Sequence, residues 1–305
     1  MWKRSIKVLV SILYWAGDSL RHWLRRMVGR QCRGTCVVLY YHGVRYGQRA
    51  QFAHQMEELM LRTKAVRADM EYPLAPGVHH AAVTFDDGFQ SVIENALPEL
   101  EKRKIPATIF VVTDALGQFP KWDDFSSGAD WQEVVMSADQ LRKIPSDLVT
   151  IGSHTMTHPT LSRHSIKEVR RELSESRARL EGILKKEVKL LSFPYGAFNE
   201  KLLDWCREAG YERVFTTSPI LAFSEPREFV TGRVRAEPTD WRLEFRLKLL
   251  GAYRWPPLAF ALKRKLLSLS PLAKIRRARL SRLEAESQDE ALRYVANQAG
   301  LKVKV

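Results

Sequence analysis

The sequence predicts an α/β fold built on a mainly parallel sheet. Runs rich in β-branched and aromatic residues alternate with amphipathic, helix-like runs between residues 37 and 235. Strands that alternate with helices pair in parallel, because each helix carries the chain back to the end of the sheet where the previous strand began. The chain has 305 residues, 45% of them hydrophobic, which suits one large domain with appendages or two ordinary domains.

The expected elements follow one another from residue 37. Strands are expected where β-branched and aromatic residues form short runs, and helices where apolar residues recur every three or four positions. Pro98 lies inside one helical run and predicts a kink or a restart there, and Asn199 can cap the start of another. In chain order we expect strands at 37–41, 81–85, 107–112, 148–152, 188–193, 213–217 and 229–235, helices at 52–65, 91–104, 138–143, 166–184 and 199–209, and a loop at 117–128.

The helix predicted at 166–184 has distinct apolar and polar faces. The apolar residues recur at helical intervals and form one face of the helix. They are Ile166, Val169, Leu173, Leu180, Ile183 and Leu184. Glu172 is assigned to the solvent-facing side, together with Arg170, Arg171, Glu175 and Arg179.

Two pairs of ionisable residues each follow a predicted strand. Asp86 and Asp87 end one strand, and His154 and His158 follow another. One Asp and two His form a ligand set that suits a divalent metal with open coordination positions, which leaves the second Asp as a carboxylate beside it. Neighbouring residues in a strand point to opposite faces, but at its end, where a turn begins at Gly88, both carboxylates can reach one site. Such a site is equipped for metal-assisted hydrolysis.

Three segments of the chain, in this order, resemble the motifs of the polysaccharide deacetylase family (carbohydrate esterase family four), exopolysaccharide-modifying type. Residues 84–88 read Thr-Phe-Asp-Asp-Gly, residues 154–158 match His-[Ser/Thr]-x-x-His, and residues 192–196 carry a Pro-Tyr pair after a strand. The resemblance extends from about residue 37 to about residue 240. It implies a distorted (β/α) barrel with fewer than eight strands, with its chemistry at the C-terminal ends of the strands.

The resemblance also implies an activity and a role for each motif residue. The protein would be a metal-dependent hydrolase that removes acetyl groups from N-acetylated sugars of a polysaccharide or a lipid-linked glycan, with O-acetylated sugars as an open alternative. Asp87, His154 and His158 would bind one divalent ion, for which zinc is expected and cobalt, nickel, manganese or iron are alternatives. Asp86 would be the catalytic base, and the backbone N–H of Tyr195 would stabilise the oxyanion. Taken alone, the same residues could be surface histidines and a helix-capping aspartate.

Two positions depart from the family pattern. Many members have an arginine three residues before the motif tyrosine, where it supports the base, but Ser192 occupies that position here. Many also supply a late histidine as general acid, and this chain has no histidine after His164. Arg233 is a candidate replacement for the missing charge, although an ordinary surface salt bridge would explain it as well. A catalytically inactive, sugar-binding relative is therefore the alternative function.

Substrate contacts are expected from residues near the ends of the strands. His42 ends the first strand, where the exopolysaccharide branch of the family has a similar Tyr-His pair, and a structural role for this histidine is the alternative. Pro194, Tyr195 and Arg233 complete the expected substrate-binding set. Stacking on sugar rings by Trp122 and Trp131 stays open, with core packing as the other use of a tryptophan.

The net charge of +14 is concentrated in two terminal arms. Residues 1–33 contain eight basic residues and one acidic residue, a net charge of +7, and residues 246–282 contain eleven basic residues and no acidic one. The remainder of the chain therefore carries a net charge of −4. We divide the chain into a basic amphipathic N-terminal helix (1–33), a polysaccharide deacetylase catalytic domain (34–240) and a basic helical C-terminal extension (241–305).

Both arms interleave apolar residues with Lys or Arg, which is typical of contact with an anionic membrane surface. A helix that packs on the domain is the other interpretation of the N-terminal arm. Its continuous apolar run is shorter than the ~20 residues of a membrane span, and no A-x-A cleavage site follows. We expect peripheral attachment to the inner membrane on the cytoplasmic side, although an uncleaved anchor with the rest exported would leave the same sequence. The apolar residues of the N-terminal arm recur at intervals of three and four and form one stripe along the predicted helix. They are Ile6, Leu9, Val10, Leu13, Ala16, Leu20, Trp23, Leu24, Met27 and Val28.

The basic residues and the cysteines exclude two further kinds of site, a nucleic-acid interface and a disulfide framework. Leucines rather than aromatic residues interleave the basic charges, and no nucleic-acid motif accompanies them, so a nucleic-acid partner is not expected. The three cysteines form no Cys-x-x-Cys pair and are expected to be unpaired thiols: Cys32, Cys36 and Cys206.

A basic membrane scaffold, in which the central domain has no activity of its own, is a third hypothesis for the function, beside the deacetylase and the inactive sugar-binding relative.

Overall fold

A single curled sheet of parallel strands forms the centre of the molecule. The computed structural model describes residues 2–29, 33–122, 133–257 and 259. Nine strands belong to the sheet in the described residues, and three of them are only two residues long. The strands are β1 (Thr35–Tyr41), β2 (Lys64–Ala65), β3 (His79–Phe85), β4 (Ala107–Val111), β5 (Val149–Ser153), β6 (Leu190–Ser192), β7 (Arg213–Phe215), β8 (Val230–Thr231) and β9 (Val234–Arg235).

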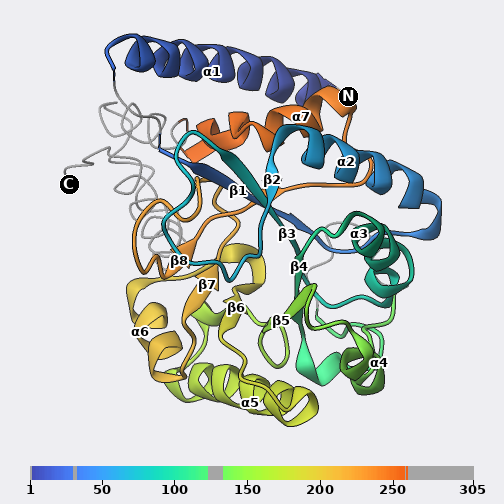
Figure 1. Cartoon of the computed structure of the whole chain (residues 1–305). Helices are drawn as coiled ribbons and strands as arrows, with labels where there is room; N and C mark the ends of the chain where they lie inside the picture. Colours follow the sequence, from blue (N-terminus) through green and yellow to red (C-terminus); the bar gives the residue numbers. More distant parts are fainter. Residues whose placement is uncertain (1, 30–32, 123–132, 258, 260–305) are drawn as a thin grey trace.

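Helices cover the outside of this sheet, as Figure 1 shows for α2 to α6. They follow the strands in the alternation that the sequence predicts, so each helix returns the chain to the beginning of the next strand. The α-helices are α1 (Trp2–Met27), α2 (Arg49–Arg62), α3 (Leu97–Arg103), α4 (Ala138–Lys143), α5 (Ile166–Leu184), α6 (Glu200–Glu208) and α7 (Arg242–Leu249).

The two edges of the sheet meet at a seam of two residues. The strand order is β8-β7-β6-β5-β4-β3-β1-β9, with β2 beside the first half of β3. Strand β8 pairs with β7 at one edge and β9 pairs with β1 at the other, yet only Gly232 and Arg233 separate β8 from β9 in the chain. The sheet must therefore curl until its edges meet, which gives the expected (β/α) barrel. The single strand predicted at 229–235 is wrong, because the seam splits it in two.

Alternate residues along the strands fill two separate cores. Val37, Leu39 and Val83 belong to the larger core, between the sheet and its helices. Phe110 and Phe215 belong to a smaller core inside the barrel. This alternation follows from the pleat of a strand, which sends successive side chains to opposite faces. The polar site described below lies where the residues that face the barrel interior reach the C-terminal ends of the strands.

Several predicted boundaries shift for local reasons. The helix expected at 52–65 ends at Arg62, because Lys64 and Ala65 pair with β3 as β2. Pro98 is at the first turn of α3, where its missing N–H is tolerated, and a π-helical turn precedes it. The predicted cap at Asn199 is confirmed, since its side chain accepts a hydrogen bond from the backbone N–H of Leu202. Cys36 and Cys206 are free and buried, and Cys32 lies outside the described residues.

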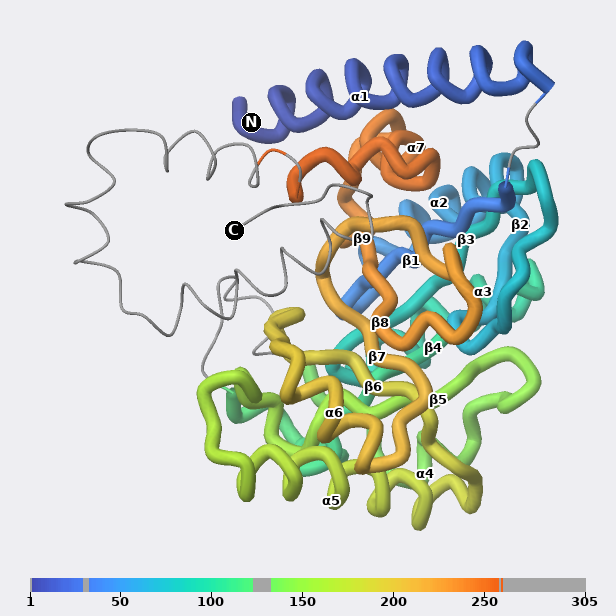
Figure 2. Tube along the Cα trace, turned by 90° about the vertical axis from the view of Figure 1, so that its left-hand side faces the viewer, coloured from blue at the N-terminus to red at the C-terminus, as the bar shows by residue number. Residues whose placement is uncertain are grey.

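The N-terminal helix lies across the flank of the barrel, outside α7 (Figures 1 and 2). It contacts α7 and the 3-10 turn that follows it, Ala252–Arg254. Within the described ranges, no helix combines the length and the hydropathy needed to cross a bilayer. The leucines expected in the C-terminal arm from Leu258 onward lie outside the described residues, so this part of the prediction has no structural counterpart here.

Gly232 gives the first prediction, because the seam leaves no room for a side chain there. A Cβ at this position would collide with Ile220 and with the carbonyl oxygen of Ser218. We expect Gly232→Ala to lower the free energy of unfolding by about 1–3 kcal/mol through overpacking, measured by urea denaturation. Gly182 in α5 is the matched control, since no atom lies within 4 Å of its added Cβ. Gly182→Ala should leave stability unchanged or raise it by about 0.5–1 kcal/mol. Equal effects of the two substitutions would contradict the tight seam.

Candidate metal centre

Three buried side chains place their ligand atoms around one point at the C-terminal ends of the strands. Asp87 follows β3, whereas His154 and His158 lie in the loop that follows β5. Oδ1 of Asp87 is 3.5 Å from Nε2 of each histidine, and one ligand atom from each of the three residues lies within 4.8 Å of the other two. All three residues are at most 6% exposed. The structure thus brings together the three residues that the sequence singled out as ligands.

A reversal of the backbone directs Asp87 to this point. Asp86 continues the alternation of β3 and faces the barrel interior. Asp87 has φ of 69°, in the left-handed region, so the turn begins one residue before the expected Gly88. His158 and Tyr195 also have positive φ, at 64° and 59°. Left-handed backbone at residues other than glycine gathers where a structure must aim side chains precisely.

Hydrogen bonds fix the orientation of both imidazole rings. Nδ1 of His154 lies 2.8 Å from the carbonyl oxygen of Ser192, which requires the proton on Nδ1 and leaves Nε2 as an electron-pair donor. Nδ1 of His158 lies 3.1 Å from the hydroxyl of Tyr195. Burial, and then the charge of His154, lower the pKa of His158 well below its usual value. A neutral imidazole is the form that binds a metal.

The donor set fits a divalent transition metal. One carboxylate oxygen and two imidazole nitrogens are typical ligands of zinc and of its first-row neighbours. Three protein ligands leave coordination positions for water or substrate, as in catalytic rather than structural zinc sites. The partners of the two Nδ1 atoms, the Ser192 carbonyl oxygen and the Tyr195 hydroxyl, provide the outer contacts that hold metal-binding histidines in place.

Glu172 of α5 holds the loop between the two histidines. Its Oε2 accepts hydrogen bonds from the backbone N–H groups of Met156 and Thr157, at 2.8 and 2.9 Å, and its Oε1 accepts one from the hydroxyl of Thr157. The assignment of Glu172 to the solvent-facing side was therefore wrong, because the residue is buried. A signal was present in the sequence: Glu172 lies three residues after Val169, on the border of the apolar stripe.

The guanidinium of Arg233 is fully buried beneath Asp86. It forms two parallel hydrogen bonds with the Asp86 carboxylate, at 2.7 and 2.8 Å. Its remaining N–H groups donate to Oγ1 of Thr84, to Oγ of Ser192 and to the carbonyl oxygen of Thr216. All five guanidinium N–H donors are thereby satisfied. The ring of Tyr40, 4.7 Å away, stacks on the same group.

This position corrects two expectations for Arg233. With an exposed fraction of 0%, it is no surface salt bridge, and it cannot contact a glycan directly. Its charge instead acts on Asp86. Burial alone would raise the pKa of the Asp86 carboxyl, but Arg233 and then His154 bring the pKa down to about 2. Ser192, where the family resemblance implies an arginine, accepts a hydrogen bond from Arg233.

The other residues expected to bind substrate differ in accessibility. Tyr195 is 38% exposed and directs its hydroxyl at His158. His42 follows β1, is partly exposed, and contributes a charge that lowers the pKa of Asp86. Pro194 is buried. Trp122 is buried against the ring of His158, 4.8 Å between centroids, which is a packing role. Trp131 lies outside the described residues.

A family model for "Polysaccharide deacetylase" matches residues 75–214, the segment that carries all three motifs. This segment is a polysaccharide deacetylase domain. Such domains belong to the hydrolases that act on carbon–nitrogen bonds other than peptide bonds. The domain ends before β8, so Arg233 is contributed by chain that follows the matched segment.

Two curated relatives align with the deacetylase domain and its neighbours. A Bacillus subtilis protein, YxkH, provisionally named a polysaccharide deacetylase, is 23% identical over 212 residues, which are 66% of this chain and 71% of that protein. A Staphylococcus aureus protein named poly-β-1,6-N-acetyl-D-glucosamine N-deacetylase is 26% identical over 142 residues, 44% of this chain. The chain spans 46% of the length of that staphylococcal relative.

Solved structures share the fold of the deacetylase domain. IcaB from Ammonifex degensii superposes with a TM-score of 0.58 at 24% identity, covering 70% of this chain and 97% of that one. A de-N-acetylase from Aggregatibacter actinomycetemcomitans gives a TM-score of 0.57 at 17% identity, covering 70% and 99%. These likenesses show that the curled parallel sheet is the deacetylase barrel.

The contacts of Arg233 lead to a second prediction. Arg233→Lys keeps the positive charge but removes the planar fork, so buried acceptors on several strands lose their donors. The free energy of unfolding should fall by about 1–3 kcal/mol. Arg235, two residues later, is the control, since both it and its partner Glu237 are more than a third exposed. Arg235→Lys should change stability by less than about 0.5 kcal/mol. Equal urea midpoints for wild type and Arg233→Lys would show that the buried fork is dispensable.

Proposed function

We propose that the protein is a metal-dependent deacetylase that removes acetyl groups from N-acetylated sugars of a polysaccharide. The observation that supports this most strongly is the adjacency of two unlike carboxylates. Asp87 faces the two imidazole Nε2 atoms, whereas Asp86 is held by Arg233. One carboxylate is thus placed to bind an ion, and its neighbour is kept ionised for proton transfer.

Asp87, His154 and His158 would hold the ion. When bound, a divalent ion supplies Lewis acidity, which lowers the pKa of water and polarises a carbonyl group. Asp86 takes the proton from the attacking water, because Arg233 keeps it ionised and fixes the direction of its oxygens. The backbone N–H of Tyr195 is proposed to stabilise the oxyanion, and the partly exposed Tyr195 ring to contact the sugar.

A proton must also reach the nitrogen of the leaving amine. His42 is suited to this step, because it is partly exposed and follows β1 directly, next to the end of β3 that carries Asp86. We assign this proton transfer to His42, in place of the late histidine that the family resemblance led us to look for. The sequence singled out His42 only as a possible substrate contact.

The substrate class is proposed from the relatives. The staphylococcal relative is named for a polymer of β-1,6-linked N-acetylglucosamine, and we propose an N-acetylglucosamine polymer as the substrate here. A lipid-linked N-acetylated sugar is the second candidate. Amide rather than ester cleavage is proposed, and acetate release from N-acetylated and O-acetylated oligomers separates the two.

The inactive, sugar-binding alternative was motivated by the missing arginine and the missing histidine. Arg233 reaches the Asp86 carboxylate from another strand end, and His42 follows Tyr41, whose carbonyl oxygen accepts a hydrogen bond from the backbone N–H of Asp86. Both observations favour the enzyme. Acetate release by the purified protein from N-acetylglucosamine oligomers decides between the two, because the alternative requires sugar binding without turnover.

Metal content gives a third prediction. The purified wild-type protein should bind one equivalent of zinc or of a neighbouring divalent metal, measured by elemental analysis after dialysis. His154→Ala should abolish stoichiometric binding, because two ligands cannot hold the ion against a competing chelator. His164→Ala is the control: this histidine pairs with Glu168 and is 40% exposed at its side chain. A full equivalent of metal in His154→Ala would refute the ligand assignment.

Proton transfer gives a fourth prediction. Asp86→Asn and His42→Gln should each retain the metal yet lower kcat by about 10²–10⁴-fold, since this is the contribution of a positioned acid or base. Circular dichroism and metal content establish that each variant is folded and loaded. Near-normal turnover by loaded Asp86→Asn would mean that another group is the base, and near-normal turnover by His42→Gln would return this residue to substrate binding.

A further inference from the structure

Helix α1 turns its apolar side away from the protein. A row of seven large apolar side chains runs along its outer face, and each is between 43% and 79% exposed: Trp2, Ile6, Leu9, Leu13, Leu20, Leu24 and Met27. Their spacing of three, four or seven residues places them on one side of the helix. A helix of 26 residues is about 39 Å long. Monomeric soluble proteins rarely expose a continuous apolar strip of this size.

The opposite side of α1 is bound to the barrel by polar contacts. Near its start, Nε of Arg4 donates to Oε2 of Glu244 at 2.5 Å. Further along, Asp18 accepts a hydrogen bond from Arg254 at 2.6 Å, and the hydroxyl of Ser11 accepts one from Trp255 at 2.9 Å. These contacts occur along much of the helix, so it cannot roll to bury the apolar row. The interpretation as a packed helix therefore holds for the inner face, and the interpretation as an interfacial helix stays a prediction for the outer one.

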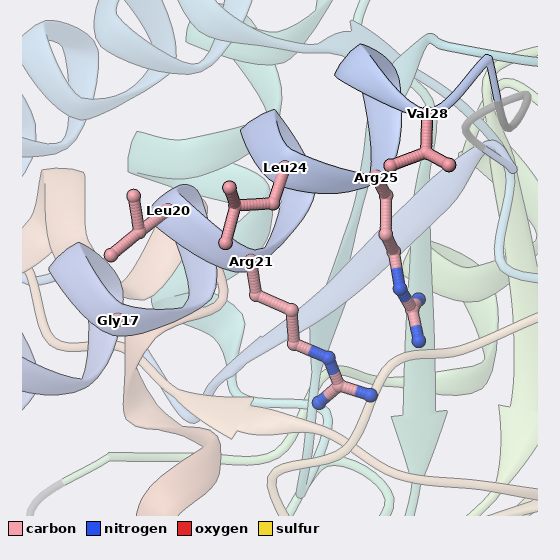
Figure 3. A pocket seen from close by; sticks show the side chains of 6 residues that line it. All are labelled: Gly17, Leu20, Arg21, Leu24, Arg25 and Val28. Carbon is pink, nitrogen blue, oxygen red and sulfur yellow. The ribbon is translucent and has the colours of Figure 1, made fainter.

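Exposed positive charges border the apolar row. Lys3, Lys7, Arg21 and Arg25 share one side of the helix by their spacing, and all four are exposed. Figure 3 shows Arg21 and Arg25 extending from successive turns beside Leu20 and Leu24. Together with Gly17 and Val28, these residues line a hollow of about 440 Å³. The acidic residue of the helix, Asp18, is on the inner face and paired with Arg254. One flank of the helix, between the apolar outer row and the inner face, thus carries positive charges that have no ion-pair partner among the described residues.

We propose that α1 docks this face on an anionic lipid bilayer. A bilayer supplies both an apolar layer for the leucines and a layer of negative head groups for the four bordering cations. A second copy of α1 would bring like-charged borders together. Residues 260–305 contain eleven basic and four acidic residues, a net charge of +7, so they too repel this face. The proposal is independent of the deacetylase activity, because none of its residues belongs to the candidate metal centre.

Co-sedimentation of the full chain with lipid vesicles tests the proposal. Wild-type protein is mixed with vesicles of phosphatidylcholine alone or with an equal part of phosphatidylglycerol. We expect binding to the anionic vesicles that weakens as salt is added. Leu9→Gln/Leu13→Gln should weaken this binding by about tenfold or more, because two buried leucines are lost from the lipid contact. Replacing all four bordering cations by Gln should weaken anionic binding and reduce its salt dependence.

Leu61→Gln is the matched control, since Leu61 is a leucine on α2 that is 79% exposed and distant from α1 in sequence. It should bind vesicles as the wild type does. Thermal unfolding and acetate release from soluble oligomers should be unchanged in all these variants, because the replaced side chains are exposed. Equal binding to both vesicle types would overturn the electrostatic part. Two results would show that a bilayer does not cover this face. One is that the wild type binds neither kind of vesicle. The other is that sedimentation velocity detects dimers of the wild type and that Leu9→Gln/Leu13→Gln dissociates them.

Discussion

The ion pair between Arg233 and Asp86 links the barrel to the candidate centre. Burying an ion pair away from water costs free energy unless every hydrogen-bond donor and acceptor around it has a partner. Here the Arg233 guanidinium donates all five of its N–H groups. Its partners lie on or directly after β3, β6 and β7, while the arginine itself lies between β8 and β9. The residue that completes the seam of the sheet is therefore the one that fixes the proposed base.

The proposed metal ligands depend on support of the same kind. Asp87 and His158 occupy left-handed backbone, a conformation that costs about 1–3 kcal/mol per residue and persists only where the surroundings enforce it. Glu172 provides such enforcement for the histidine loop through three hydrogen bonds. Ser192 contributes twice, since its carbonyl oxygen fixes His154 and its hydroxyl accepts a hydrogen bond from Arg233. The ligands are thus held by residues that would never touch the ion.

The sequence was most informative where the determining contacts are local. Helix α5 has the predicted bounds, because its apolar repeat and its capping serine lie within one stretch of chain. The candidate ligands were found because short motifs hold them at fixed spacing. The sequence offered Arg233 as a candidate for the charge that supports the base but left a surface salt bridge open as well, since 147 positions separate Arg233 from Asp86 and only the curled sheet brings them together. The split between β8 and β9 was missed for the same reason: no local pattern marks a seam.

The position of Arg233 restricts the substitutions that this end of the barrel tolerates. An arginine at position 192, with Arg233 still present, would place two guanidinium groups against one buried carboxylate, because Ser192 already accepts a hydrogen bond from Arg233. Loss of Arg233 would leave that carboxylate without the counter-charge to which both of its oxygens are bonded. Both single substitutions are therefore costly, and the charge could move from position 233 to position 192 only if both residues changed together.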